Sequence, residues 1–211
     1  MDSFDANRGS RIAAALVRTI RENRDSLSEI DGLIGDGDHG VNMNKGFAKF
    51  AEAAGDQEMD VSEAFKRLGR TLLGDIGGSM GPLYGSFFIE MSKKAKGLEA
   101  IDANAFDEML TAALYKIKEI GGAVPGDKTM VDCLEPAVLA YHAALGQGAG
   151  FAEALCAMKD AAIKGRDATV DMTAKLGRAS RLGERSRGVP DAGATSCCLI
   201  LCAMAEEIIK Q

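Results

Sequence analysis

The chain lacks several residue types that mark particular classes of protein. It has no tryptophan, 5% aromatic residues, four prolines and two histidines among its 211 residues. Neither His39 nor His142 stands near a cysteine, which argues against a zinc site. Acidic residues (31) outnumber lysine and arginine (25), and no basic run is interleaved with aromatic residues. We therefore expect no nucleic-acid partner, because neutralised phosphates supply most of the affinity for nucleic acids.

Long apolar runs and paired cysteines are also missing. No apolar run approaches the roughly 20 residues that span a bilayer. The N-terminal stretch Ile12–Ile20 is interrupted by Arg18 and lacks the small-residue cleavage site of a signal peptide. The five cysteines are odd in number, and three of them, Cys197, Cys198 and Cys202, share one apolar segment. Free thiols in a reducing compartment explain them better than disulfides, so we expect a cytoplasmic protein without a membrane anchor.

Apolar residues at helical spacing are abundant. The hydrophobic share of 46% is enough to bury a core. Apolar stripes run over Ile12–Leu27, Phe47–Ala54, Ala64–Leu72, Leu83–Met91, Phe106–Ile117, Leu134–Tyr141, Leu155–Ala162 (with a possible extension through Met172) and Ala194–Ile208. Asp60 and Glu63 form a candidate capping box, and Pro82 suits the first position of a helix. With no sustained period-two alternation, the pattern predicts an all-α, single-domain antiparallel bundle of about eight helices over residues 1–211.

The segment from Asp31 to Asn44 carries the first chemical signal. Asp31, Asp36 and Asp38 lie within eight residues, and glycines between them let the backbone fold the carboxylates together. Such a cluster favours a hard divalent ion such as Mg²⁺. An EF-hand is excluded because its fifth and twelfth positions would be Gly40 and Phe47. A solvated acidic turn with a helix cap is the alternative interpretation.

Two glycine-rich segments precede predicted helices. Residues 74–82 place Gly77, Gly78 and Ser79 before a helix start, where free backbone N–H groups and the helix dipole favour an anion. An ordinary helix–helix turn is the alternative. Residues 121–129 resemble a P-loop but fail its pattern, because Asp127 separates the second glycine from Lys128 and no strand precedes them.

A fourth segment, residues 178–193, contains four arginines within ten residues, and guanidinium groups suit phosphate oxygens. A charged, solvated loop is the alternative. In an up-and-down bundle, alternate loops emerge at the same end. The four segments together therefore predict a metal-bridged polyphosphate site, most simply a nucleoside diphosphate or triphosphate with Mg²⁺.

Five sequence stretches carry a resemblance to a known family. They are GDGDHGVNMN (35–44), GGSMGPLYG (77–85), PGDKTM (125–130), GRASRLGERS (177–186) and DAGATS (191–196). In this order they resemble the nucleotide-binding L subunit of dihydroxyacetone (glycerone) kinase. Many members of the family have Ser at the position of Met80. A thioether cannot donate the hydrogen bond that a hydroxyl donates to phosphate, but the backbone N–H of Met80 can donate one.

The resemblance implies an eight-helix barrel that holds ADP or ATP at one end through two Mg²⁺ ions. It implies that Asp31, Asp36 and Asp38 bind metal and that Arg178 is catalytic, neutralising charge on the transferred phosphoryl group. The implied nucleotide contacts are His39, Gly40, Val41, Asn42, Ser79, Met80, Gly121, Met130, Arg178, Asp191, Ala192 and Gly193.

The resemblance also implies partners. The ketose would be held by a separate sugar-binding kinase subunit (DhaK-type), which a chain of this length does not include. A separate nucleotide-binding chain favours phosphoenolpyruvate as the phosphate source, through a phosphohistidine carrier protein (DhaM-type) of the phosphotransferase system. The alternatives are an ATP-dependent kinase subunit for a related triose or tetrose, a nucleotide-loaded module that binds a transcription regulator, and a structural bundle with an incidental acidic turn. A homodimer stays open.

Overall fold

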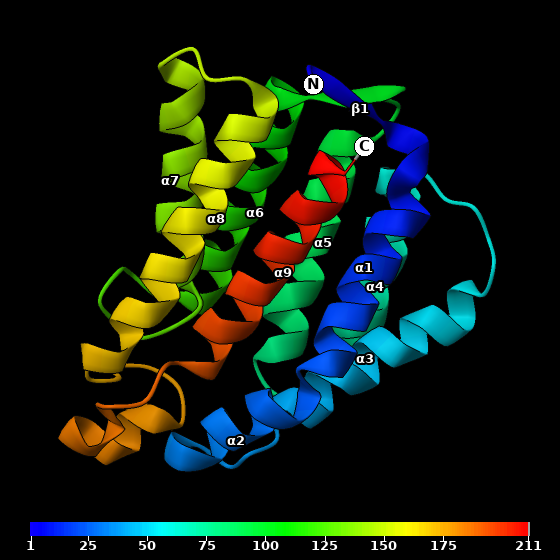
Figure 1. The fold of residues 1–211 in the computed structure, drawn as a ribbon. Helices are drawn as coiled ribbons and strands as arrows, with labels where there is room; N and C mark the ends of the chain where they lie inside the picture. Colours follow the sequence, from blue (N-terminus) through cyan, green and yellow to red (C-terminus); the bar gives the residue numbers. More distant parts are fainter. Residues whose placement is uncertain (211) are drawn as a thin grey trace.

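Nine α-helices make up most of residues 1–210, the part of the chain that the computed structural model describes (Figure 1). They are α1 (Gly9–Glu22), α2 (Arg24–Ile34), α3 (His39–Ala54), α4 (Val61–Asp75), α5 (Met80–Ala95), α6 (Ala103–Gly121), α7 (Val131–Gly146), α8 (Phe151–Ala168) and α9 (Ala192–Ile209). Three 3-10 helices, η1 (Ala6–Arg8), η2 (Thr169–Asp171) and η3 (Ala179–Ser186), and two strands, β1 (Ser3–Asp5) and β2 (Ala100–Asp102), complete it. The all-α prediction is confirmed.

The first predicted helix is two helices in the structure. Asn23 leaves the helical conformation (φ −102°, ψ 8°), and both its backbone N–H and its side-chain amide donate to the carbonyl of Thr19. These bonds end α1, so the apolar stripe from Ile12 to Leu27 continues in α2 in a new direction. A helix count of nine instead of eight follows from this single break.

Other boundaries differ by small amounts. Helix α5 begins at Met80, which makes Pro82 its third residue. Helix α8 ends at Ala168, and the predicted extension through Met172 is instead the separate turn η2 followed by extended backbone. The predicted cap at Asp60 is present, since its side chain accepts a 2.7 Å hydrogen bond from the N–H of Glu63.

The two strands form a short antiparallel pair that the sequence pattern did not reveal. Phe4 of β1 lies opposite Ile101 of β2, and both side chains are buried. Each strand has three residues, too few for an alternating pattern to stand out. The pair ties the N-terminus to the start of α6.

Helix α9 runs through the core of the bundle. It packs against α8, α1, α7 and α2, and its buried side chains join one continuous apolar core. In the described part of the chain it is the one helix long and apolar enough to cross a membrane by length and composition, and most of it is buried inside the bundle. Burial of this kind is ordinary for the central helix of a bundle.

The bundle has two different ends. One, which we name the site end, consists of residues 35–38, 76–79, 122–130 and 169–191; it lies at the bottom of Figure 1, beside α2. The other, which we name the strand end, consists of β1, β2 and residues 55–60, 96–99 and 147–150. All four segments with predicted chemistry therefore lie at the same end, as an up-and-down bundle requires.

Candidate functional site

Three carboxylates meet where α2 gives way to α3. Asp31 lies in the last turn of α2, and Asp36 and Asp38 lie in the loop that follows, with oxygens that all come within 4.8 Å of one another. Gly37 makes the turn possible because its φ of 75° is one that L side chains rarely adopt. Burial raises the pKa of Asp31, and the charges of Asp36 and Asp38 raise it further. The cluster therefore favours a bound cation.

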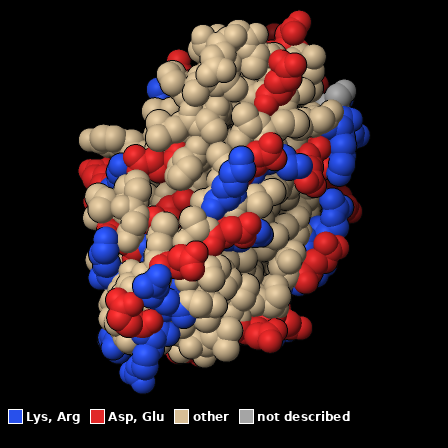
Figure 2. All heavy atoms as spheres, turned by 60° about the vertical axis from the view of Figure 1, so that its left-hand side comes forward, with Lys and Arg blue, Asp and Glu red and all other residues tan. Residues whose placement is uncertain are grey.

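Arg178 supplies positive charge to this cluster. Its guanidinium forms ion pairs with Asp36 and, at 3.4 Å, with Asp38. It comes from residues 172–190, which we name the arginine segment, and this segment contacts α2 through η3. Figure 2 shows Lys and Arg atoms gathered with a few acidic atoms at the lower end of the molecule. The guanidinium occupies the position of a counter-ion for two of the three carboxylates.

Helix α5 begins with an open amino end. Gly77, Gly78 and Ser79 are exposed, and the Ser79 side chain makes no capping hydrogen bond. Met80 is half-buried against the core, so its thioether points away from solvent while its backbone N–H lies in the first turn. Uncapped N–H groups at a helix start suit an anion such as a phosphate.

Helices α3 and α9 begin with carboxylate caps. Asp31 accepts a 3.4 Å hydrogen bond from the N–H of His39, and Asp191 accepts a 2.7 Å bond from the N–H of Ala194. Burial raises the pKa of Asp191 to about 6, against the opposing effect of the Ala194 N–H and of nearby Lys128. The start of α9 thus brings a desolvated carboxylate close to the site.

A buried polar network joins three helices beneath the site. The His39 ring (Nε2) lies 2.8 Å from the Ser196 hydroxyl, which lies 2.6 Å from the Tyr84 hydroxyl. Tyr84 donates in turn to the carbonyl of Gly193. Burial lowers the pKa of His39 to about 4, so its ring is neutral at pH 7. Because the imidazole faces Ser196 in the interior, only the backbone of His39 lies at the carboxylates.

The loop between α6 and α7 is braced by its own acidic residues. Asp127 accepts a bond from the N–H of Val124, and Asp132 accepts bonds from the N–H groups of Gly126 and Thr129. Lys128 points into the protein, in agreement with the failed P-loop pattern. Met130 is buried beside the start of α9, close to Gly193.

The sequence-predicted residues all lie at the site end or in the helix turns that open from it. The structure brings Arg178 onto the carboxylates, and it leaves Val41, Ser79 and Gly121 exposed around them. Sequence reasoning missed Tyr84, Ser196, Lys128 and the fully buried Thr169. The first three lie inside the motif stretches, but their partners are too distant in sequence for any spacing to reveal them.

Comparison with known proteins gives a consistent picture. The model of the family described as "DAK2 domain" matches residues 33–206, so that Asp31 lies just before the matched region. The chain is 39% identical over 188 residues to the ADP-binding subunit DhaL of PEP-dependent dihydroxyacetone kinase 1 from Listeria innocua, covering 89% of each chain. It is 32% identical to the D-erythrulose kinase of Mycolicibacterium smegmatis, covering 94% of this chain and 35% of that enzyme.

A solved structure shares the fold. The dihydroxyacetone kinase of C. freundii, in complex with AMP-PNP and Mg²⁺, superposes with a TM-score of 0.71 at 27% sequence identity. The match covers 98% of this chain and 34% of that one. In these two longer relatives, the DhaL-like part is about a third of the protein.

Proposed function

The chain belongs to the DAK2 domain family, and from this premise we propose that it is the ADP/ATP-binding subunit of a dihydroxyacetone kinase. It would transfer a phosphoryl group from Mg²⁺-bound nucleotide to a ketose held by another subunit. The observation that carries the proposal is the meeting of the three carboxylates with Arg178 beside the uncapped start of α5. That arrangement offers a cation site, an anion site and a guanidinium within one end of a bundle.

The donor set fits magnesium. Asp31, Asp36 and Asp38 offer only oxygen ligands, as hard divalent ions require, and their mutual repulsion is balanced here by a guanidinium. These three residues would hold the metal, for which we propose two ions. When bound, Mg²⁺ neutralises charge on the phosphates and links them to the carboxylates.

The chain's own groups would bind the nucleotide. Backbone N–H groups at the uncapped start of α5, in the turn that holds Ser79 and Met80, can donate to phosphate oxygens. In the first turn of α3, Gly40 and Asn42 are further proposed contacts. The remaining proposed contacts are His39, Val41, Gly121, Met130, Arg178, Asp191, Ala192 and Gly193. Met130 is buried beside Gly193 and gives this side of the site an apolar surface on which an adenine ring can pack.

Arg178 is the proposed catalytic residue. Its side chain is 55% exposed and reaches the carboxylates from the arginine segment. Once a metal ion neutralises these carboxylates, the guanidinium would lie beside the transferred phosphoryl group. A guanidinium there stabilises the negative charge that spreads over the equatorial oxygens during transfer.

The partners follow from the same proposal. We propose a sugar-binding subunit as the acceptor partner and a phosphohistidine carrier, fed by phosphoenolpyruvate, as the donor partner, in the cytoplasm. The relative from Listeria is named as PEP-dependent, and all five cysteines of this chain are free thiols, which supports a reducing compartment. We further propose that residues 1–211 form a single nucleotide-binding domain; a homodimer stays a prediction.

Transfer to a ketose tests the proposal directly. The purified chain, mixed with a sugar-binding subunit and dihydroxyacetone, is assayed with either ATP or phosphoenolpyruvate plus the carrier proteins. We expect phosphorylation that needs Mg²⁺, and we expect ADP in the supernatant after heat denaturation of the purified chain. Erythrulose as a second acceptor separates a triose kinase from a tetrose kinase.

Two outcomes would count against it. Nucleotide binding without transfer to any ketose would favour a sensor that binds a transcription regulator. A chain without nucleotide, whose melting temperature does not respond to Mg²⁺ and ADP, would favour a structural bundle, since a ligand bound only by the folded state raises the midpoint.

A further inference from the structure

Lys128 is buried although it carries a charge that no proposed step uses. Its side chain is 1% exposed, and its ammonium donates to three backbone carbonyls: Met172 at 3.2 Å, Ser186 at 2.5 Å and Val189 at 2.7 Å. An ammonium has three protons and no acceptor, so all of its hydrogen-bonding capacity is used. Lys128 is therefore fully committed to holding backbone.

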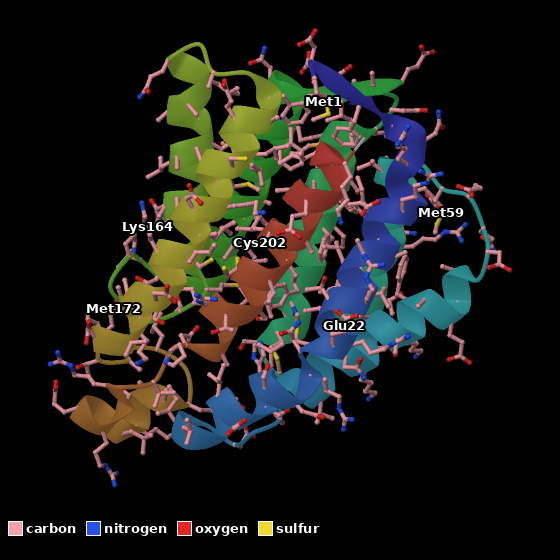
Figure 3. All side chains as sticks on the ribbon, in the orientation of Figure 1. Met1, Glu22, Met59, Lys164, Met172 and Cys202 are labelled. Atoms are coloured by element: carbon pink, nitrogen blue, oxygen red, sulfur yellow. The ribbon has the colours of Figure 1, made fainter. Side chains whose placement is uncertain are left out.

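The three carbonyls lie at the two roots of the arginine segment. Met172 precedes η3, Ser186 is its last residue and Val189 follows it, so one ammonium binds both sides of the segment from which Arg178 projects. Figure 3 labels Met172 beside the lower part of α8, near which the segment leaves the bundle. Fixing both roots of a loop restricts the positions that its tip can reach.

Other bonds close the same roots. The N–H of Lys175 donates to the carbonyl of Asp127, and the N–H of Gly188 donates to the carbonyl of Val170. The Ser186 hydroxyl accepts from the N–H of Ala174. Lys175 adds an ion pair with Asp127 at 3.4 Å. Lys128 lies where these bonds converge, and its ammonium bonds backbone at both roots.

The backbone of Lys128 adds an independent observation. Its φ of 61° is the one positive φ of a residue other than glycine in the described part of the chain. An L side chain in the left-handed region is strained, and such strain persists where the surroundings impose it. At this position glycine would be easier to accommodate, but glycine has no ammonium.

We propose that Lys128 is a positioning residue, which fixes Arg178 over the carboxylates by clamping both roots of the arginine segment. The part that concerns phosphoryl transfer rests on the proposed function. The clamp itself does not, because it is a property of the free protein.

Hydrogen exchange in the free protein tests the clamp. Lys128→Met keeps a long side chain but removes the charge. We expect the amides of Ala174, Lys175 and Gly188 to exchange at least about tenfold faster in this variant, because three fewer hydrogen bonds have to break when the segment opens. Amides in α4 and α5 should be unchanged. Tyr141→Phe is the matched control: it removes another fully buried donor, to the carbonyl of Ala103 near the strand end, and should leave the arginine segment protected.

Lys128→Gly separates the clamp from the strain. This variant relieves the left-handed backbone and removes the ammonium at once. We expect the segment to exchange as fast as in Lys128→Met. If the segment of Lys128→Gly stays as protected as in the native chain, Lys128 is not a clamp and the proposal is overturned.

A double-mutant cycle tests the effect on Arg178. In the complete kinase, we expect Lys128→Met to lower the transfer rate at least about tenfold, and to change the rate little when Arg178→Ala is already present, because both variants remove the same placed guanidinium. Independent, additive losses would overturn the positioning role. A native chain that transfers nothing would contradict the proposed function instead, and the exchange results would still decide the clamp.

Discussion

The two ends of the bundle satisfy their polar groups in different ways. At the strand end, Asp60 and Asp102 cap the helices that they precede through the N–H three residues ahead. At the start of α8 a local bond runs the other way, since the Glu153 side chain accepts from the N–H of Gly150. At the site end, Lys128 bonds residues 44 to 61 positions away, and His39 meets Ser196 across 157 positions. The strand end also has bonds between distant residues, such as those of the Ser10 hydroxyl with the carbonyl of Gln57 and the N–H of Met59. The difference is that the site end places a buried imidazole and a buried ammonium on partners that only the completed fold supplies.

The difference has an energetic meaning. Local caps form with the helix itself and contribute modestly to stability. The buried groups of the site end depend on one another, and several are held in costly states: a neutral His39, a desolvated Asp191 and a left-handed Lys128. Functional sites commonly retain such costs. Variants at the strand end should therefore change stability alone, whereas variants at the site end should also change ligand binding.

The largest difference in ligand affinity between variants of the two ends is expected at the carboxylates. The double variant Asp36→Asn, Asp38→Asn should weaken binding of Mg²⁺·ADP by at least about 100-fold, roughly 3 kcal/mol, because neutral amides are poor metal ligands. Asp60→Asn at the strand end should leave the affinity unchanged. Isothermal calorimetry measures both, and equal affinities for the native chain and the double variant would contradict the assignment of the metal site.

The next effect is a pH dependence of stability that comes from two buried groups of the site end, His39 and Asp191. His39 titrates near 4 in the folded protein and near 6.5 when unfolded, so the unfolded chain binds more protons between these values. The free energy of unfolding should therefore fall as the pH drops from 6.5 to 4, by up to about 3 kcal/mol. Asp191, whose pKa is raised to about 6, acts in the opposite direction over pH 4 to 6 and offsets most of this.

The two contributions can be separated by substitution. The two contributions nearly cancel in the native chain. Between pH 6.5 and 4.5, the free energy of unfolding, measured with denaturant, should therefore rise for His39→Gln and fall more steeply for Asp191→Asn than for the native chain. A pH dependence of His39→Gln that equals the native one would show that the buried imidazole does not contribute.

Two glycines offer a matched pair of overpacking variants. A Cβ at Gly9, near the strand end, would collide with the carbonyl of Asp60, and a Cβ at Gly40, in the first turn of α3, would collide with the carbonyl of Arg24. Each alanine variant should lose about 2 kcal/mol of stability. Only Gly40→Ala should also weaken Mg²⁺·ADP, because it displaces the α3 start from the carboxylates; a similar loss of affinity in Gly9→Ala would contradict the division into two ends.

The smallest effect is expected for the two buried tyrosine hydroxyls. Tyr84→Phe removes the hydroxyl that bonds Ser196 and the carbonyl of Gly193, and Tyr141→Phe removes the hydroxyl that donates to the carbonyl of Ala103. Each should cost about 1 to 2 kcal/mol of stability. Calorimetry should find weaker nucleotide binding for Tyr84→Phe alone. Identical losses of affinity in both variants would mean that the network beneath the site has no special relation to it.

The same division explains what the sequence could predict. Helices follow from a spacing of three and four residues, and the carboxylate cluster from three aspartates within eight residues; both are local patterns. The break at Asn23 was missed because the apolar stripe continues across it, and the strand pair was missed because three residues show no period.

The rest of the site could not be predicted for a physical reason. The resemblance predicts that His39 contacts the nucleotide, and its backbone lies at the site end; the partner of its ring, Ser196, is one that only the tertiary fold supplies. Lys128 was examined as a phosphate ligand of a P-loop, and the structure instead gives it three carbonyls from beyond α8. A side chain's partner decides its role, and these partners are distant in sequence.

The strand pair has a practical consequence for handling the protein. Because β1 begins at Ser3 and α9 runs from the site end to Ile209, the two termini emerge together at the opposite face, as Figures 1 and 3 show. Affinity tags, fluorescent labels or a surface tether attached at either terminus would point away from an incoming partner subunit. An immobilised chain would thus present its working face to the solution without further engineering.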